Sequence, residues 1–100
     1  MLDLKGIGNK MVYVEQLEHK NQYVIVDAEN DKITFQSYDS QVCVWDIKEK
    51  TLFLYGKVWD YSNTTRKHFA LFLSKYCGTE YKSKKDFLKL IQSSDKIKVI

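Results

Sequence analysis

Apolar and polar residues alternate along the first half of the chain in five short runs. The runs cover residues 11–17, 22–28, 32–38, 41–47 and 51–59. They are rich in Val, Ile, Tyr, Phe and Trp, and a period of two with these residues is typical of β-strands. The polar links between the runs are only long enough for hairpins, so the pattern predicts an antiparallel meander.

After residue 60 the apolar period lengthens to about 3.6 residues, which indicates helices. The first helix is expected over residues 64–77, with Gly78 as its left-handed C-cap. Its apolar stripe comprises Phe69, Phe72, Leu73, Tyr76 and Cys77. A second helix is expected from an N-cap at Ser83 to about residue 93, and residues 95–100 predict a short edge strand.

The chain of 100 residues is long enough to bury one hydrophobic core. We therefore expect a single α+β domain, with a five- or six-stranded, mainly antiparallel meander sheet and two C-terminal helices packed on one face. Its parts would be an irregular lead-in at 1–10, the sheet at 11–60, the helices at 61–94 and the edge strand at 95–100.

Successive side chains of a strand point to opposite faces, so each run divides into two sets. The first set is aliphatic and is expected to pack under the helices. It comprises Val12, Val14, Val24, Val26, Ile33, Phe35, Val42, Val44, Leu52, Leu54 and Val58. The second set is aromatic and comprises Tyr13, Tyr23, Trp45, Phe53, Tyr55 and Trp59, with Tyr38 as a further member.

Three interpretations of the aromatic set stay open on the sequence. The rings can form an interface with a partner protein or with a second copy of the chain, because aromatic anchors dominate such interfaces. They can stack on the bases of single-stranded nucleic acid, although Glu15 and Asp27 on the same face disfavour a phosphate backbone. They can also be buried inside the domain.

Charge is unevenly distributed along the chain. Residues 1–65 contain 7 Lys and Arg against 10 Asp and Glu, whereas residues 66–100 contain 9 against 3, so the two parts carry −3 and +6. A compact molecule with this asymmetry has one positive end. We expect that end to face an acidic partner, which can be phosphate or an acidic protein surface.

The start of the first helix concentrates polar and basic groups. Ser62, Asn63 and Thr64 are each suitable N-caps, Thr65 adds a hydroxyl, and the first turn carries Arg66, Lys67 and His68 where acids are normally favoured. One interpretation is an anion or partner site at the helix start, joined by the basic residues Lys75, Lys82, Lys84 and Lys85. The alternative is that a nearby acid such as Asp60 offsets these charges.

Candidate catalytic and metal-binding residues are few. The soft metal ligands are His19, Cys43, His68 and Cys77, and they lack the close spacing of zinc sites. His68 and Cys77 would stand about 13 Å apart along one helix, too far for a nucleophile and its base. We therefore expect no enzyme activity, no metal and no cofactor.

The sequence also predicts a cytoplasmic location. No apolar run reaches the ~20 residues of a membrane span, and the first ten residues lack the pattern of a secretion signal. Cys43 and Cys77 are expected to stay reduced in that compartment.

The string DYSNTTRKHFALFL at residues 60–73 resembles a signature of small phage and mobile-element proteins, in which a strand ends in Tyr-Ser-x-Thr-Thr and a basic residue, a His and an apolar helix follow. The matching positions are Tyr61, Ser62, Thr64, Thr65 and His68. The resemblance implies a phage origin and a compact accessory or counter-defence protein that acts on a host factor.

The sequence as a whole predicts a small, non-enzymatic binding protein that inhibits or modulates a host protein or ribonucleoprotein, as anti-CRISPR proteins do. The basic residues would meet an acidic surface, and Trp45, Tyr55 and Trp59 would supply apolar anchors. The competing prediction is a DNA- or RNA-binding accessory protein that uses the same basic helices for phosphates.

Overall fold

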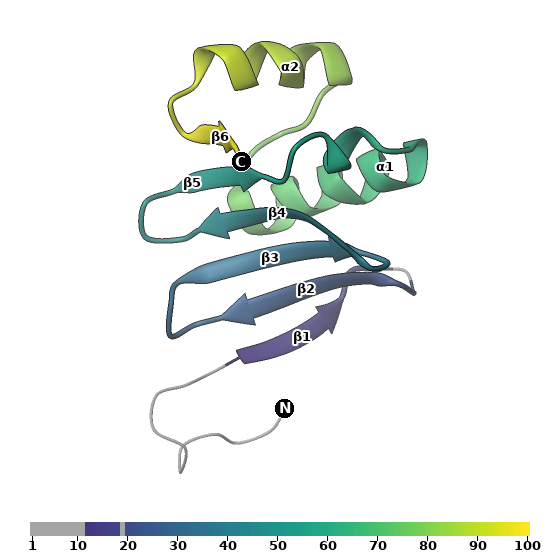
Figure 1. Cartoon of the computed structure of the whole chain (residues 1–100), viewed down its shortest axis with the longest axis vertical. Coiled ribbons are helices and arrows are strands. Elements are labelled where there is room, and N and C mark those ends of the chain that lie inside the picture. The colour runs from purple at the N-terminus through teal and green to yellow at the C-terminus, as the bar shows by residue number, and fades with distance from the viewer. Residues whose placement is uncertain (1–11, 19) are drawn as a thin grey trace.

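The computed structural model of the chain describes residues 12–18 and 20–100, so the lead-in expected at 1–10 and His19 lie outside the described residues. The fold is α+β, with a six-stranded, mostly antiparallel sheet and two α-helices, as the sequence predicted (Figure 1). The sheet has the strand order β1-β2-β3-β4-β5-β6, in which each strand neighbours the next along the chain.

The first five strands form the predicted antiparallel meander. They are β1 (Val12–Gln16), β2 (Gln22–Asp27), β3 (Lys32–Ser37), β4 (Ser40–Asp46) and β5 (Thr51–Leu54). The predicted edge strand is β6 (Ile97–Val99), which pairs parallel to β5. A parallel neighbour requires a long crossover, and the helices between residues 55 and 96 provide it.

The helices begin and end at the residues that the local signals indicated. A 3₁₀ turn, η2 (Val58–Asp60), precedes α1 (Asn63–Phe72), whose N-cap is Ser62. A π-helical turn, η3 (Leu73–Cys77), extends α1 to Gly78, which has a φ of 65°. Helix α2 (Lys84–Ser93) starts after the N-cap Ser83.

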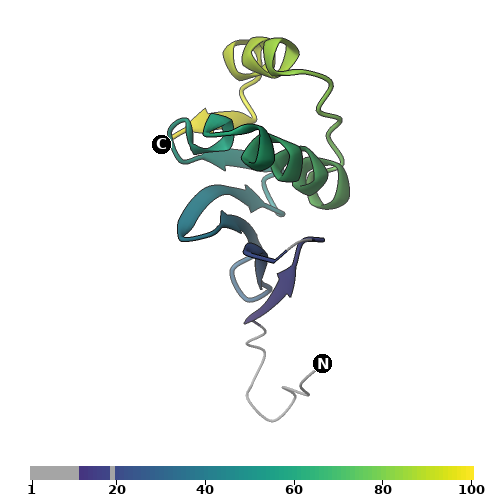
Figure 2. The same ribbon diagram turned by 90° about the vertical axis from the view of Figure 1, so that its right-hand side faces the viewer.

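Both helices contribute to one core, but they pack in different places. Phe72 of α1 stacks on Phe35 of β3 with ring centroids 5.5 Å apart, so α1 covers the sheet. Phe87 is the buried residue of α2, and it packs edge-on against Trp59 at 4.9 Å and Phe69 at 5.2 Å. Figures 1 and 2 show α2 beyond the β6 edge of the sheet rather than over its centre.

Part of the predicted division between the two sheet faces is wrong at β1. Residues directly opposite each other in an antiparallel pair share a face, and β1 pairs Tyr13 with Val26 and Glu15 with Val24. Tyr13 therefore lies on the helix-covered face. Val12 and Val14 lie on the other face, where their side chains are 54% and 59% exposed.

A β-bulge causes a second correction, in β4. The register of β3 and β4 shifts between Phe35 and Gln36, so Cys43 opposes Phe35 and Trp45 opposes Ile33. Two consecutive residues, Val42 and Cys43, are therefore buried. From Cys43 onward, each side chain of β4 points to the sheet face opposite to the one predicted. Trp45 consequently lies on the helix-covered face, and Val44 lies on the opposite one.

The third correction concerns Trp59, which was expected at the end of a strand. The strand ends at Leu54, and Gly56 turns the chain with a φ of 56°. Trp59 therefore falls in η2, where it is 2% exposed and packs against α1 and α2. It is part of the core and not of an exposed aromatic surface.

Candidate functional site

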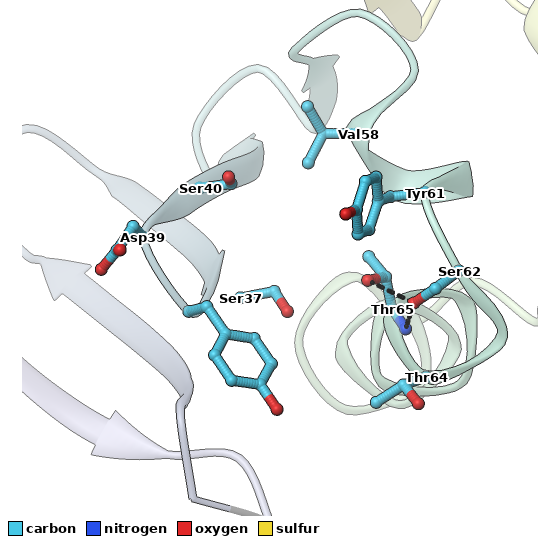
Figure 3. Close-up of a pocket in the computed structure, with 9 residues that line it drawn as sticks. Ser37, Asp39, Ser40, Val58, Tyr61, Ser62, Thr64 and Thr65 are labelled. Carbon is cyan, nitrogen blue, oxygen red and sulfur yellow. Dashed lines mark hydrogen bonds between the residues drawn. The ribbon is translucent and has the colours of Figure 1, made fainter.

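A hollow that is lined by several of the predicted site residues lies between the β3–β4 turn and the start of α1 (Figure 3). Its volume is about 590 Å³. In Figure 3 Ser37, Asp39 and Ser40 stand on one side, and Val58, Tyr61, Ser62, Thr64 and Thr65 stand on the other. We call this hollow the tyrosine cleft; its lining residues are Ser37, Tyr38, Asp39, Ser40, Val58, Tyr61, Ser62, Thr64 and Thr65.

Two tyrosines make this cleft unusual. Tyr61 is 84% exposed and Tyr38 is 59% exposed, although large aromatic side chains normally bury most of their surface. Tyr38 also has a φ of 53°, a left-handed conformation that a bulky side chain rarely adopts. Its backbone N–H donates to the carbonyl of Asn21 at 2.7 Å, which ties this strained turn to the β1–β2 turn.

The polar groups at the helix start are only partly available to a ligand. Ser62 Oγ accepts the N–H of Thr65 at 3.1 Å and lies 3.1 Å from Thr65 Oγ1, so the cap is closed by the chain itself. Thr65 is buried, whereas Asn63 and Thr64 are exposed. Among the predicted N-caps, Ser62 performs the role.

Arg66 does not reach into the cleft as a free cation. Its Nη1 donates to Asp60 Oδ1 at 2.7 Å, and its Nη2 donates to Asn63 Oδ1. Lys84 Nζ lies 2.9 Å from Asp60 Oδ2. The hydrogen bonds from Lys84 and Arg66 lower the pKa of Asp60 against the opposing effect of burial. Asp60 therefore offsets the charge of Arg66, as one of the two interpretations expected.

A second, shallower hollow of about 410 Å³ adjoins the cleft and shares Tyr38 and Thr64 with it. The other residues that line this second hollow are Lys20, Asn21, Gln22, Lys67 and His68. Lys67 is exposed, but His68 is 3% exposed and its Nδ1 lies 2.8 Å from the carbonyl oxygen of Thr64. Two lysines thus border the cleft, while His68 belongs to the buried side of α1.

The other predicted basic residues lie on different surfaces. Lys84 and Lys85 line a hollow of about 520 Å³ on α2, together with Leu88, Lys89 and Gln92. Lys82 is exposed in the link between the helices. Lys75 is in η3, and its Nζ lies 5.4 Å from the centre of the Tyr76 ring. The structure therefore does not join all the predicted basic residues into one site.

The predicted aromatic interface also divides. Tyr23 and Phe53 lie half-buried on the sheet face that no described helix covers, and Tyr55 follows β5 as a half-buried residue. Tyr13, Trp45 and Trp59 pack on or within the core instead. An interface made of all six rings is therefore wrong.

The side chains of Cys43, Cys77 and Tyr76 have raised pKa values. Both cysteines are free thiols, and burial raises the pKa of Cys77 to about 12 and that of Cys43 well above its usual value. Burial and a 2.9 Å hydrogen bond to Glu15 raise the pKa of Tyr76 to about 12. Within residues 12–18 and 20–100, no group of three or more His, Cys, Asp or Glu is placed to hold a metal ion.

Membrane-spanning helices are absent from the described part of the chain, where neither α-helix has the length and apolarity that a span requires.

Sequence reasoning missed the tyrosine cleft because it depends on a tertiary contact. Tyr38 was assigned to the aromatic sheet face, and Tyr61 was noted only in the phage-like signature. One signal in the sequence could have indicated it. Tyr38 and Asp39 form a two-residue hairpin loop, where glycine or asparagine is normally found because the backbone adopts a positive φ that is unfavourable for tyrosine.

Comparisons with known proteins connect the chain to one family. No curated protein and no solved structure matches it. Residues 4–89, which are most of the chain, match the profile described as "Family of unknown function (DUF8033)". The chain belongs to this family, DUF8033.

Proposed function

We propose that this chain is a small, non-enzymatic binding protein of phage origin that binds and inhibits or modulates a host protein or ribonucleoprotein. Its place of action would be the host cytoplasm, and its role would be counter-defence of the anti-CRISPR kind. The phage origin rests on the Tyr-Ser-x-Thr-Thr signature at residues 61–65 and His68.

The single observation that carries the binding role is the pair of exposed tyrosines beside the cleft. Exposed, well-positioned tyrosines are frequent binding hot spots, since they offer a large apolar area and a hydroxyl at little entropic cost. Tyr38 is held there in a left-handed conformation that costs about 1–2 kcal/mol relative to an unstrained turn.

The composition of the cleft favours binding over catalysis. Apart from Asp39, the groups that line it are hydroxyls, two tyrosines and Val58, which provide hydrogen bonds and apolar contact but no nucleophile with an adjacent base. Lys20 and Lys67 at its border favour an acidic patch on the partner.

Affinity capture from a phage-host lysate tests the proposal. The tagged wild-type chain should recover a specific host protein, and Tyr61→Ala should reduce its recovery by at least about tenfold, as loss of a hot spot does. Tyr38→Gly should also reduce recovery while it relieves the strained turn.

Ile47→Ala is the matched control, because Ile47 is an exposed apolar residue in the β4–β5 turn at the other end of the sheet. It should leave recovery unchanged. Equal recovery with wild type, Tyr61→Ala and Ile47→Ala would refute the cleft as the binding surface.

A nucleic-acid-binding role is the second candidate, and the basic hollow on α2 favours it. Lys84, Lys85 and Lys89 line that hollow and are exposed. Titration of labelled single- and double-stranded oligonucleotides over a salt series tests it. Affinity that falls steeply with salt and weakens in the Lys85→Ala, Lys89→Ala double variant would support this role. No binding at about 50 mM salt would exclude it.

A further inference from the structure

Strand β1 is an edge of the sheet among the described residues. It neighbours only β2 among the described strands. Its pairing with β2 continues to Leu17, whose N–H donates to the carbonyl of Gln22 at 2.7 Å. Hydrogen-bonded pairs alternate in an antiparallel ladder, so Tyr13, Glu15 and Leu17 bond to β2. The N–H and C=O groups of Val12, Val14 and Gln16 therefore point away from the sheet.

This edge carries fewer of the features by which proteins prevent edge-to-edge pairing than the opposite edge does. Such edges usually carry lysine, proline or an inward-pointing charge. β1 has no lysine or proline, and its one charged side chain, Glu15, points to the helix-covered face, where it accepts a hydrogen bond from Tyr76. The opposite edge strand, β6, contains Lys98 and follows Lys96. The backbone of β1 is therefore the less protected of the two edges.

The exposed face of β1 is also apolar. Val14 opposes Ile25, which opposes Thr34, and this row continues through Val44 and Phe53. The row crosses five strands on the face that no described helix covers, and it ends at the exposed side chain of Val14. A strand added beside β1 would lengthen this row and bury Val14.

We propose that a second copy of this chain pairs with β1, strand to strand and antiparallel, about a two-fold axis through Val14. Val14 then opposes Val14 of the second copy, Val12 opposes Gln16, and Tyr13 opposes Glu15. The outward-pointing groups of the even-numbered residues meet, which forms about six backbone hydrogen bonds between the copies. The result is one continuous sheet with the helices of both copies on the same side.

Charge selects this register over the next one. The outward-pointing backbone groups of the two β1 strands also meet if one strand slides by two residues along the other. A slide in one direction places Glu15 directly opposite Glu15 of the second copy. Like charges that oppose each other destabilise a sheet. The other direction leaves fewer described residues paired. The Val14-centred register pairs all five residues of β1 without opposing like charges.

The dimer is expected to be weak, since a five-residue strand pair buries less surface than a stable interface. Sedimentation equilibrium should give a monomer of 11.8 kDa at about 1 µM and a mass approaching twice that value at about 500 µM. This proposal uses a different surface from the tyrosine cleft, so it can stand or fail independently of the proposed function.

Variants of Val14 test the register directly. V14K and V14E should each be monomeric at about 500 µM because like charges face each other across the two-fold axis, whereas an equimolar mixture should dimerise again. V99K is the matched control: Val99 is 54% exposed on β6, close to the 59% of Val14, and this variant should dimerise as wild type does. Circular dichroism should show that all the variants are folded.

Two results would overturn the proposal. One is a wild-type chain that stays monomeric up to about 500 µM, the concentration at which a weak interface should be populated. The other is a dimer that V99K abolishes, or one that the mixture of V14K and V14E does not restore.

Discussion

Lys84 Nζ lies 2.9 Å from Asp60 Oδ2, which connects the first residue of α2 to the turn before α1. Helix α2 buries only Phe87 fully, and the half-buried Ile91 packs beside the core, so this ion pair is one of few contacts that hold α2 on the domain. The tyrosine cleft lies at the start of α1 and the basic hollow lies on α2. The attachment of α2 therefore decides how the tyrosine cleft and the basic hollow are placed relative to each other.

Replacement of Asp60 by Asn should make stability less dependent on acid pH. Hydrogen bonds from Lys84 and Arg66 lower the pKa of Asp60 in the folded chain. A lowered folded-state pKa gives stability that is present above the unfolded value of about 4 and is lost as the pH falls through the folded value. The unfolding temperature of Asp60→Asn should lie below that of wild type at pH 5–7, and the lost stability should be that of partly exposed ion pairs, about 0–1 kcal/mol for each partner. The difference should shrink as the pH falls below about 4 and disappear once the pH is below the folded pKa of Asp60.

Asp95→Asn is the control for this experiment, because Asp95 is an exposed acid that forms no ion pair with a described residue. Its unfolding temperature should follow that of wild type at every pH. A difference between wild type and Asp60→Asn that persists unchanged at pH 2 would contradict the proposed ion pairs.

Loss of the Phe87 ring should destabilise the domain and release α2. Phe87 is 1% exposed and contacts the rings of Trp59, Phe69 and Tyr81 at 4.9 to 5.6 Å. Truncation of such a residue costs about 3–5 kcal/mol. Urea unfolding should show this loss for Phe87→Ala, and amide exchange should accelerate most in α2. Leu88→Ala, at a neighbouring residue that is 43% exposed, should change stability by less than about 1 kcal/mol. Similar costs for both variants would contradict this packing.

The helix boundaries could be predicted because their determinants are local. Ser62 and Ser83 cap residues three positions along the chain, at Thr65 and Asp86, and Gly78 supplies a left-handed C-cap within one turn. Each of these interactions involves neighbours in sequence. The alternation of apolar residues likewise predicted the five meander strands.

The faces of Tyr13, Trp45 and Trp59 could not be predicted because they depend on distant partners. The bulge at Phe35 and Gln36 inverts β4, and no turn residue marks it in the sequence. Gly56 ends β5 early, although the apolar pattern continues to Trp59. The tyrosine cleft needs the β3–β4 turn and the start of α1 to lie together, and strand pairing alone does not determine how a helix lies on a sheet.

Tyr38→Gly should stabilise the domain. A non-glycine residue in a left-handed conformation costs about 1–2 kcal/mol, whereas glycine adopts this conformation without strain. The greater conformational freedom of glycine in the unfolded chain offsets part of the resulting gain in stability. We expect about 0.5–1 kcal/mol more stability by urea unfolding. Lys50→Gly is a matched control, since Lys50 has a φ of 52° in the β4–β5 turn. It should stabilise similarly without affecting partner recovery. A less stable Tyr38→Gly would show that contacts of the ring outweigh the strain.

Both thiols should resist alkylation until the chain unfolds. Burial raises the pKa of Cys77 from an ordinary 9.0 to about 12, which lowers the thiolate fraction near pH 8 by about 1,000-fold. Cys43 is fully buried and should react still more slowly. Iodoacetamide labelling followed by mass spectrometry should give slow modification of the folded chain at pH 8 and rapid modification of both cysteines in urea. Cys77→Ser is the control. It removes the faster-reacting thiol, so only the slower modification of Cys43 should remain in the folded chain. Rapid native labelling of Cys77 would mean that η3 opens readily and exposes the thiol.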